Sequence, residues 1–221
     1  MPAKIISSDS GLCLKTPNGD GSSYILYNSA ELLDAISDIT SELDPSWKSR
    51  RMEAAATRRQ IRDEIYEAVV EKGMIIRAAI RVQRSPEGQW GVSSVSSAVA
   101  APGWGPTLYD AVMFLEGGLT ADRSEVSRRA AGVWRKYRDR SDITAKPFDD
   151  VEDPKTPDPS DDAVMHPGGL ENPLNWAYFK SEAPILAGLV DNHESMSRTL
   201  RDYGINLDDH AGTLFVRRYT Y

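Results

Sequence analysis

The stretch "SAVAAPGWGPTLYDAVMFLEGG", residues 97–118, limits the possible folds more than any other part of this 221-residue chain. It follows a run of valines and serines that is typical of a strand, and it continues into an apolar segment with helical spacing. Gly103 and Gly105 permit backbone conformations that other residues avoid, and Pro106 suits the first turn of a helix. A strand that turns into a helix in this way directs free backbone N–H groups at one point. Such a corner favours an anion.

The remaining elements follow from hydrophobic periodicity and turn residues. Turn dipeptides within residues 1–28 predict a hairpin-like turn between two strands. A helix capped by Asn28 or Ser29 follows, and residues 46–73, which contain no interior proline or glycine, are predicted to form a helix that stops at Gly73. Further segments are two antiparallel strands at 74–83 and 90–100, and two helices at 106–116 and 124–138. We therefore expect an α+β fold, in which helices flank a mixed, mostly antiparallel sheet.

An acidic stretch divides the chain into three parts. The segment "FDDVEDPKTPDPSDD", residues 148–162, holds seven acidic residues and three prolines with one lysine, so it cannot bury enough apolar surface to order itself. We expect a core at 1–147, an acidic, proline-rich linker or loop at 148–170, and a C-terminal part at 171–221. This last part is predicted to contribute a helix and a strand that complete or extend the sheet.

The charge and the composition exclude several classes of function. A formal net charge of −7 opposes sequence-independent binding of nucleic acid. The chain has no run of about 18 apolar residues and no apolar leader-like segment near its start, which indicates a cytoplasmic protein without a membrane span. Cys13 is the only cysteine and the three histidines lack ligand spacing, so neither an intrachain disulfide nor a cysteine or histidine metal site is expected.

Two segments carry a resemblance to a known family. "AAPGWG" places Ala100 three positions before Gly103 and keeps a second glycine at Gly105. This resembles the Gln/Arg-x-x-Gly-x-Gly/Ala loop with which the GNAT superfamily, the acetyl-CoA-dependent N-acyltransferases, grips the cofactor pyrophosphate. "SRRAAGVW" is similar to the Asn-x-x-Ala-x-x-Leu-Tyr motif of that family, with Trp134 in the tyrosine position. The likeness covers residues 20–140, and the part from Gly103 onward is also similar to GNAT-like proteins of tailed bacteriophages.

The resemblance implies a GNAT-like core, a cofactor and a reaction. The cofactor is acetyl-CoA or another acyl-CoA, and the residues expected to bind it are Ala101, Gly103, Trp104, Gly105 and Thr107. The reaction is transfer of the acyl group to an amine, whose identity the sequence does not indicate. One group has to remove a proton from the amine, and another has to protonate the departing thiolate.

The catalytic groups of the family pattern have to come from other positions in this chain. The indole of Trp134 is not a useful acid, so Tyr137, about one helical turn later, or Tyr109 is expected to protonate the thiolate. The strand at 90–100 holds no carboxylate, which leaves Glu87 in the preceding turn as the nearest candidate base or as a solvated turn residue. The four serines of that strand either contact a pantetheine-like or peptide-like ligand or are polar residues of a half-exposed strand.

A second interpretation keeps the fold without the catalysis. The missing motif tyrosine and carboxylate suit a structural or interaction protein, such as a phage virion or host-interaction component in the host cytoplasm or the virion. A protein partner, or a homo-oligomer, is then expected to engage the acidic segment and the C-terminal part. The basic residues between Arg123 and Arg140 fit both interpretations, because they either neutralise cofactor phosphates or form a solvated helix face.

Overall fold

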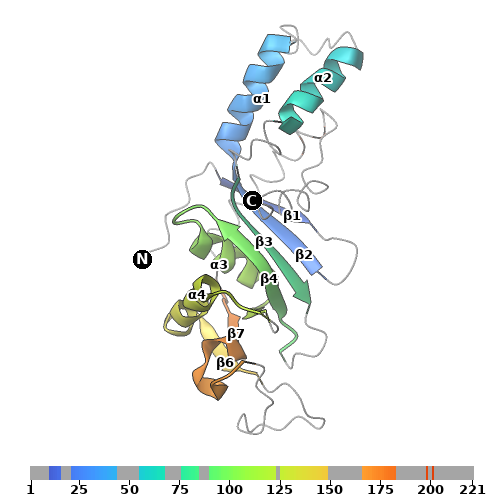
Figure 1. Ribbon diagram of the computed structural model, residues 1–221. Helices are drawn as coiled ribbons and strands as arrows, with labels where there is room; N and C mark the ends of the chain where they lie inside the picture. Colours follow the sequence, from blue (N-terminus) through green and yellow to red (C-terminus); the bar gives the residue numbers. More distant parts are fainter. Residues whose placement is uncertain are drawn as a thin grey trace.

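A mixed β-sheet with associated helices makes up the part of the chain that the structure describes. The computed structural model describes residues 10–15, 21–43, 55–67, 76–84, 90–122, 125–148, 166–182, 198 and 201. Within these residues, seven strands form one sheet in the order β1-β2-β3-β4-β5-β7-β6, together with four α-helices (Figure 1). All neighbouring strands pair antiparallel except β4 and β5, which are parallel. The predicted α+β fold with a mixed, mostly antiparallel sheet is confirmed.

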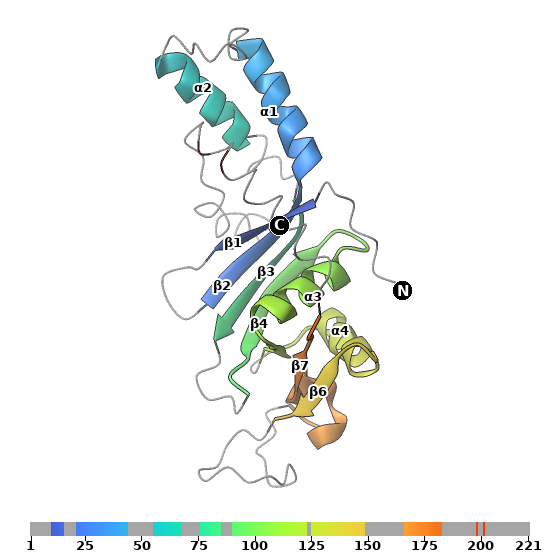
Figure 2. The same cartoon turned by 180° about the vertical axis from the view of Figure 1, so that it is seen from behind.

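The first half of the sheet is an antiparallel meander that a helical hairpin interrupts. Its strands are β1 (Ser10–Lys15), β2 (Gly21–Asn28), β3 (Ile76–Arg84) and β4 (Ser93–Ala100). Between β2 and β3 the chain forms α1 (Ser29–Leu43) and α2 (Ala55–Tyr66), which contact each other and project from one end of the sheet (Figure 2). The pairing of β1 with β2 agrees with the hairpin predicted within residues 1–28.

The second half is built around crossover connections. α3 (Gly105–Leu115) connects β4 to its parallel neighbour β5 (Leu119–Ala121), and α4 (Arg128–Arg138) connects β5 to β6 (Thr144–Pro147). The last described strand, β7 (Trp176–Phe179), follows two short 3₁₀ helices, η3 (Gly169–Glu171) and η4 (Pro173–Asn175). It lies between β5 and β6 and is antiparallel to both.

The main core lies between the sheet and the two crossover helices. It combines apolar side chains from β2 to β5 and β7 with those of α3 and α4, and its largest fully buried members include Leu26, Ile80, Leu108, Met113, Trp134 and Tyr178. Trp134 of α4 stacks on Tyr178 of β7 with ring centroids 5.2 Å apart. Because alternate residues of a strand face opposite sides, Ala177 of β7 joins a second cluster with Val92 and Phe148 instead. The two clusters hold β7 in the sheet from both faces.

Side-chain caps begin two of the helices. The Asn28 carboxamide oxygen accepts hydrogen bonds from the backbone N–H groups of Ala30 (3.1 Å) and Glu31 (3.2 Å), as the sequence predicts for the start of α1. Ser127 caps α4 by accepting from the N–H of Ala130 at 3.3 Å. Each cap satisfies N–H groups that have no acceptor inside the helix.

The structure differs from the sequence predictions mainly in the short strands. β5, β6 and β7 are three or four residues long, too short to produce a readable period, and the sequence around β7 suggests only a loop with aromatic anchors. Phe148, assigned by sequence to the acidic linker, is buried. The acidic residues at 149–162 and the helix and strand predicted beyond residue 182 lie outside the described residues, except positions 198 and 201.

Two adjacent glycines after α3 provide a test of the packing. A Cβ at Gly118, whose φ is +140°, would lie 2.5 Å from Val92 Cγ1 and 2.8 Å from Phe179 Cε1, whereas Gly117, at φ +71°, has no atom within 4 Å of its Cβ position. Gly117→Ala is expected to lower the free energy of unfolding by about 1–2 kcal/mol through backbone strain alone. Gly118→Ala should cost roughly 1–3 kcal/mol more, because it also overpacks the second cluster. Urea unfolding measures both values, and equal losses would contradict the close packing at Gly118.

Candidate functional site

The corner between β4 and α3 has a fixed backbone. The N–H of Ala101 donates to the carbonyl of Arg77 at 2.7 Å, and the N–H of Trp104 donates to the carbonyl of Ala101 at 3.1 Å. Gly103, inside this turn, has φ +87°, a conformation that glycine adopts without strain. At Gly105 an added Cβ would have only Ala100 Cβ, 3.8 Å away, within contact distance. The sequence prediction of a glycine corner at this point is confirmed.

The first turn of α3 contains a buried hydroxyl group without a partner. Thr107 is 5% exposed, and among the described residues its Oγ1 has no hydrogen-bond partner. Trp104 occupies the N-cap position without a side-chain hydrogen bond, and Pro106 lies in the first turn. Leaving a buried hydroxyl unpaired costs free energy, so Thr107 is a locally unfavourable feature of this turn. The N-terminal N–H groups of the helix favour an anionic ligand.

The parallel ladder between β4 and β5 is shorter than β4 itself. It pairs Ser93 with Leu119, Ser94 with Thr120 and Val95 with Ala121, and among the described residues it ends there. Next along the strand, the register between β3 and β4 shifts, so that Ser96 is an extra residue opposite Arg81 and Val82. Such a β-bulge bends the strand and increases its twist. The bulge therefore lies next to the point where the ladder with β5 ends, and β4 continues from there to the glycine corner.

Most serines of β4 have acceptors inside the protein. Ser93 donates to the carboxylate of Glu116 at 2.5 Å, Ser94 to the carbonyl of Gln83 at 3.4 Å, and Ser96 to the carbonyl of Arg81 at 3.2 Å. The Ser96 hydrogen bond spans the bulge and supports its shape. Three of the four serines therefore have a hydrogen-bond acceptor within the protein, and no ligand is needed to explain them.

Glu116 is a carboxylate next to β4 that sequence reasoning missed. It follows α3 and accepts hydrogen bonds from Tyr24 of β2 and from Ser93 of β4. Burial and the hydrogen bond to Glu116 raise the pKa of Tyr24 above its usual range. Glu116 is separated from Gly105 by the length of α3, about 16 Å. It anchors the C-terminal end of α3 to the sheet, at the opposite end from the glycine corner, and the helix-ending glycines after it are the only signal for it in the sequence.

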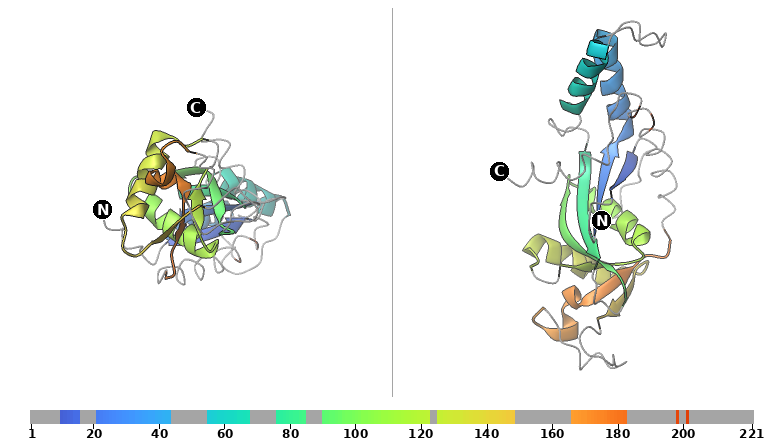
Figure 3. Two further views of the ribbon diagram at one scale, coloured as in Figure 1. Left: turned by 90° about the horizontal axis from the view of Figure 1, so that it is seen from below. Right: turned by 90° about the vertical axis from the view of Figure 1, so that its right-hand side faces the viewer.

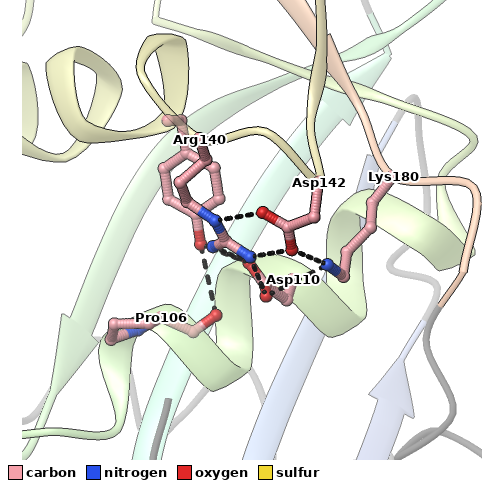
Figure 4. Close-up of polar contacts among 6 residues, drawn as sticks. Pro106, Asp110, Arg140, Asp142 and Lys180 are labelled. Atoms are coloured by element: carbon pink, nitrogen blue, oxygen red, sulfur yellow. Dashed lines mark hydrogen bonds and ion pairs between the residues drawn. The ribbon is translucent and has the colours of Figure 1, made fainter. Parts of the chain in front are cut away.

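Tyr137 links α4 to the first turns of α3, where it contacts Pro106 and Asp110, both of which are labelled in Figure 4. Its hydroxyl donates to Asp110 Oδ1 at 2.6 Å and lies 3.2 Å from the carbonyl oxygen of Pro106. Burial, followed by the negative charge of Asp110, raises the pKa of Tyr137 well above its usual value. An efficient general acid has a pKa near the working pH, so this environment favours an anchoring role.

Four charged residues extend this contact into a network, here called the Asp110 network. Arg140 donates to both carboxylate oxygens of Asp110, at 2.7 and 2.8 Å, and to both of Asp142, at 2.8 and 2.5 Å. Lys180, after β7, lies 2.6 Å from Asp142 and 3.6 Å from Asp110. Hydrogen bonds from Arg140 and Lys180 hold the pKa of Asp142 well below its usual range. Together with Tyr137, these two acids and two bases join α3, α4 and the end of β7.

The predicted site residues fall into two groups. The predicted cofactor residues, Ala101 to Thr107, form the corner and the first turn of α3. Tyr109 is buried, and its ring lies 5.7 Å from that of Trp134 and 6.1 Å from that of Tyr137, centroid to centroid. Glu87 lies outside the described residues. The structure thus brings Tyr109 and Tyr137 together behind the corner, and their catalytic roles stay predictions.

Comparisons with known proteins identify no relative of this chain. No family model, no curated protein and no solved structure matches the chain. Among the described residues, no group of histidine, cysteine, aspartate and glutamate side chains is arranged to hold a metal ion. None of the described helices combines the length and the apolar character that crossing a membrane requires.

A pair of tyrosine variants tests the link between α4 and α3. Tyr137→Phe removes a hydrogen bond to a carboxylate, so it is expected to lower the free energy of unfolding by about 1.5–3 kcal/mol. Tyr178→Phe is the matched control, because the hydroxyl of Tyr178 donates to the neutral carbonyl of Pro173 at 2.6 Å. Its expected loss is about 0.5–1.5 kcal/mol. Chemical denaturation gives both values, and a larger loss for the control would contradict the charged link.

The alkaline stability of the protein depends on the same tyrosines. Burial raises the pKa values of Tyr24, Tyr137 and Tyr178. The folded state therefore keeps phenol protons that the unfolded chain releases near pH 10, so stability is complete below about pH 10 and falls as the pH rises further. In Tyr137→Phe, the fall in the free energy of unfolding should be shallower by up to about 1.4 kcal/mol per pH unit. Urea titrations above pH 9 measure this slope; an unchanged slope means that Tyr137 titrates normally.

Proposed function

We propose that this chain binds an acyl-CoA at the corner between β4 and α3 and transfers the acyl group to an amine. The observation that carries the proposal is the course of β4, which leaves β5 after Val95, bends at the Ser96 bulge and ends at the glycine corner. A linear ligand with amide groups, such as the pantetheine arm, suits the backbone of a strand whose ladder has ended, because such a backbone offers it N–H and C=O groups. The fold-level analogy with GNAT proteins is consistent with this placement.

The phosphate end of the cofactor belongs at the start of α3. Gly103 and Gly105 let phosphate oxygens approach the backbone, and the helix N-terminus supplies a positive potential. Thr107, whose buried hydroxyl has no partner among the described residues, lies in the same turn. Gln or Arg, which the family pattern places before the glycines, is replaced by Ala100, so backbone groups carry most of the recognition.

The chemical step requires two proton transfers. The amine nitrogen forms a bond to the thioester carbonyl carbon and loses a proton, and the carbon–sulfur bond breaks while the thiolate gains one. Glu87 stays the proposed base, and Tyr109 and Tyr137 stay the proposed acids. Of the two tyrosines, Tyr137 also donates a hydrogen bond to Asp110, which holds α4 against α3.

A specific observation favours a second candidate, a non-catalytic GNAT-like structural or interaction protein. Trp134 stands in the tyrosine position of the family motif, is fully buried and stacks on Tyr178, where it reaches no ligand at the corner. Tyr137, the nearest substitute, is committed to Asp110. These packing roles suit a fold retained as a scaffold, as in a phage virion or host-interaction component located in the host cytoplasm or the virion.

Ligand-dependent stability tests the proposal with one variant and one matched control. A ligand at 100 times its Kd stabilises the folded state by about 2.7 kcal/mol. For a chain of this size, acetyl-CoA should then raise Tm by roughly 5–10 °C. Gly105→Glu places a negative charge in the open space at the corner and should abolish the shift. Gly132→Glu adds the same charge to α4, where the nearest atom to the Cβ position is 4.0 Å away, and should keep it.

The outcomes separate the two candidate functions. A saturable shift that is lost only in Gly105→Glu, with release of the free CoA thiol when primary amines are present, supports the acyltransferase. A shift without thiol release for any amine supports a cofactor-binding scaffold. The absence of any shift with millimolar acetyl-CoA would rule out cofactor binding and leave the interaction protein.

A further inference from the structure

The outer face of α4 is strongly basic. Arg128, Arg129, Arg135 and Lys136 are all exposed, and α4 contains no acidic residue. At 3.6 residues per turn, these four side chains fall within about one third of the helix circumference, and together they are called the basic face. Among the described residues, none of the four belongs to an ion pair. Within the described part of the chain, the face therefore presents four positive charges that no ion pair compensates, on a chain whose formal net charge is −7.

The outer face of α1 has the opposite charge. Glu31, Asp34, Asp38 and Glu42 are exposed, they lie within about a quarter of the circumference, and α1 contains no basic residue. Glu31 forms an ion pair with Arg77, whereas the other three belong to none among the described residues. These four residues are called the acidic face. Leu33, which is 47% exposed, lies next to it in the sequence.

The two faces match in length but lie apart in the molecule. The acidic face extends about 16 Å along α1 and the basic face about 12 Å along α4, at 1.5 Å per residue. α1 belongs to the hairpin that projects from one end of the sheet, and α4 lies toward the other end, beside β6 and β7 (Figures 1 and 3). The two faces therefore do not meet within one chain.

We propose that the basic face of α4 docks on the acidic face of α1 in a second copy of this chain. The contact joins different surfaces of two identical molecules, so it leaves one face free at each end and continues into a ring or a filament. This inference is independent of acyl-CoA binding and goes beyond the proposed function. It assigns the contact of the predicted homo-oligomer to the basic face of one copy and the acidic face of the next.

A second copy fits the basic face better than nucleic acid does. Binding of nucleic acid works against the repulsion from a net charge of −7, and single-stranded binding also relies on exposed aromatic rings. The aromatic residues of α4, Trp134 and Tyr137, are buried. The acidic face offers separate carboxylates, to which guanidinium groups bind in bidentate geometry.

The expected association is weak and sensitive to salt. Each exposed ion pair contributes little to the free energy of association. Added salt shortens the distance over which the opposite charges attract each other. Sedimentation of the full chain in about 50 mM salt should show a mass that rises with concentration to at least twice the monomer mass. In about 500 mM salt the monomer should predominate. A monomer at every concentration in low salt overturns the proposal.

Charge reversal identifies the two surfaces. Arg128→Glu with Arg135→Glu leaves two positive and two negative charges on the basic face, and Asp34→Lys with Asp38→Lys does the same to the acidic face, so each double variant keeps only one charged face and should be monomeric alone. A mixture of the two variants should associate again, because opposite faces then meet between unlike copies. Arg59→Glu with Arg84→Glu, at exposed positions outside the basic face, should associate as the unaltered chain does. The four residues that are reversed, two on each face, are exposed. Circular dichroism verifies that each variant folds.

The mixture is the decisive measurement. Restored association in the mixture supports the proposal, because a general effect of charge on solubility would not be corrected by combining two non-associating variants. Association that survives either reversal, or that fails to return in the mixture, overturns it. A monomeric chain that binds DNA in low salt and loses that binding in Arg128→Glu with Arg135→Glu also overturns it, and assigns the basic face to nucleic acid.

Discussion

The parallel pairing of β4 with β5 determines how the rest of the structure is arranged. Parallel neighbours cannot be joined by a tight turn, so the chain has to cross the face of the sheet between them, and α3 is that crossover. The crossover covers the main core and places the start of a helix at the end of β4. Since the ladder spans only Ser93 to Val95, the rest of β4 reaches the corner paired with β3 alone among the described strands.

α3 is held at both ends by contacts of different chemistry. At its C-terminal end, Glu116 accepts hydrogen bonds from hydroxyl groups of β2 and β4. In its N-terminal half, the Asp110 network joins it to α4 and to Lys180 after β7. The part of α3 that follows the corner is thus held by charged groups that form ion pairs with one another. The backbone of the corner is therefore held in one arrangement by contacts within the protein.

The sequence predicts the local elements well and the long-range contacts poorly. Gly103, Pro106 and the apolar spacing after them are enough to place the corner and α3, because turn conformations and helix starts depend on neighbouring residues. β7 is different: four residues, Trp176 to Phe179, become a strand because β5 and β6 lie on either side. Glu116 and Lys180 were missed for the same reason, since their partners are distant in the sequence. The acyltransferase role of the corner rests on the resemblance and stays a prediction.

The position of β7 also orders the events of folding. Among the described strands, β6 pairs with β7 alone, so this pairing cannot form until residues 176–179 have been made, although β6 precedes them by almost thirty residues. The same short strand brings Tyr178 to Trp134 and carries Lys180 to Asp142. The support behind the corner is therefore complete only once residues 176–180 have joined β5 and β6.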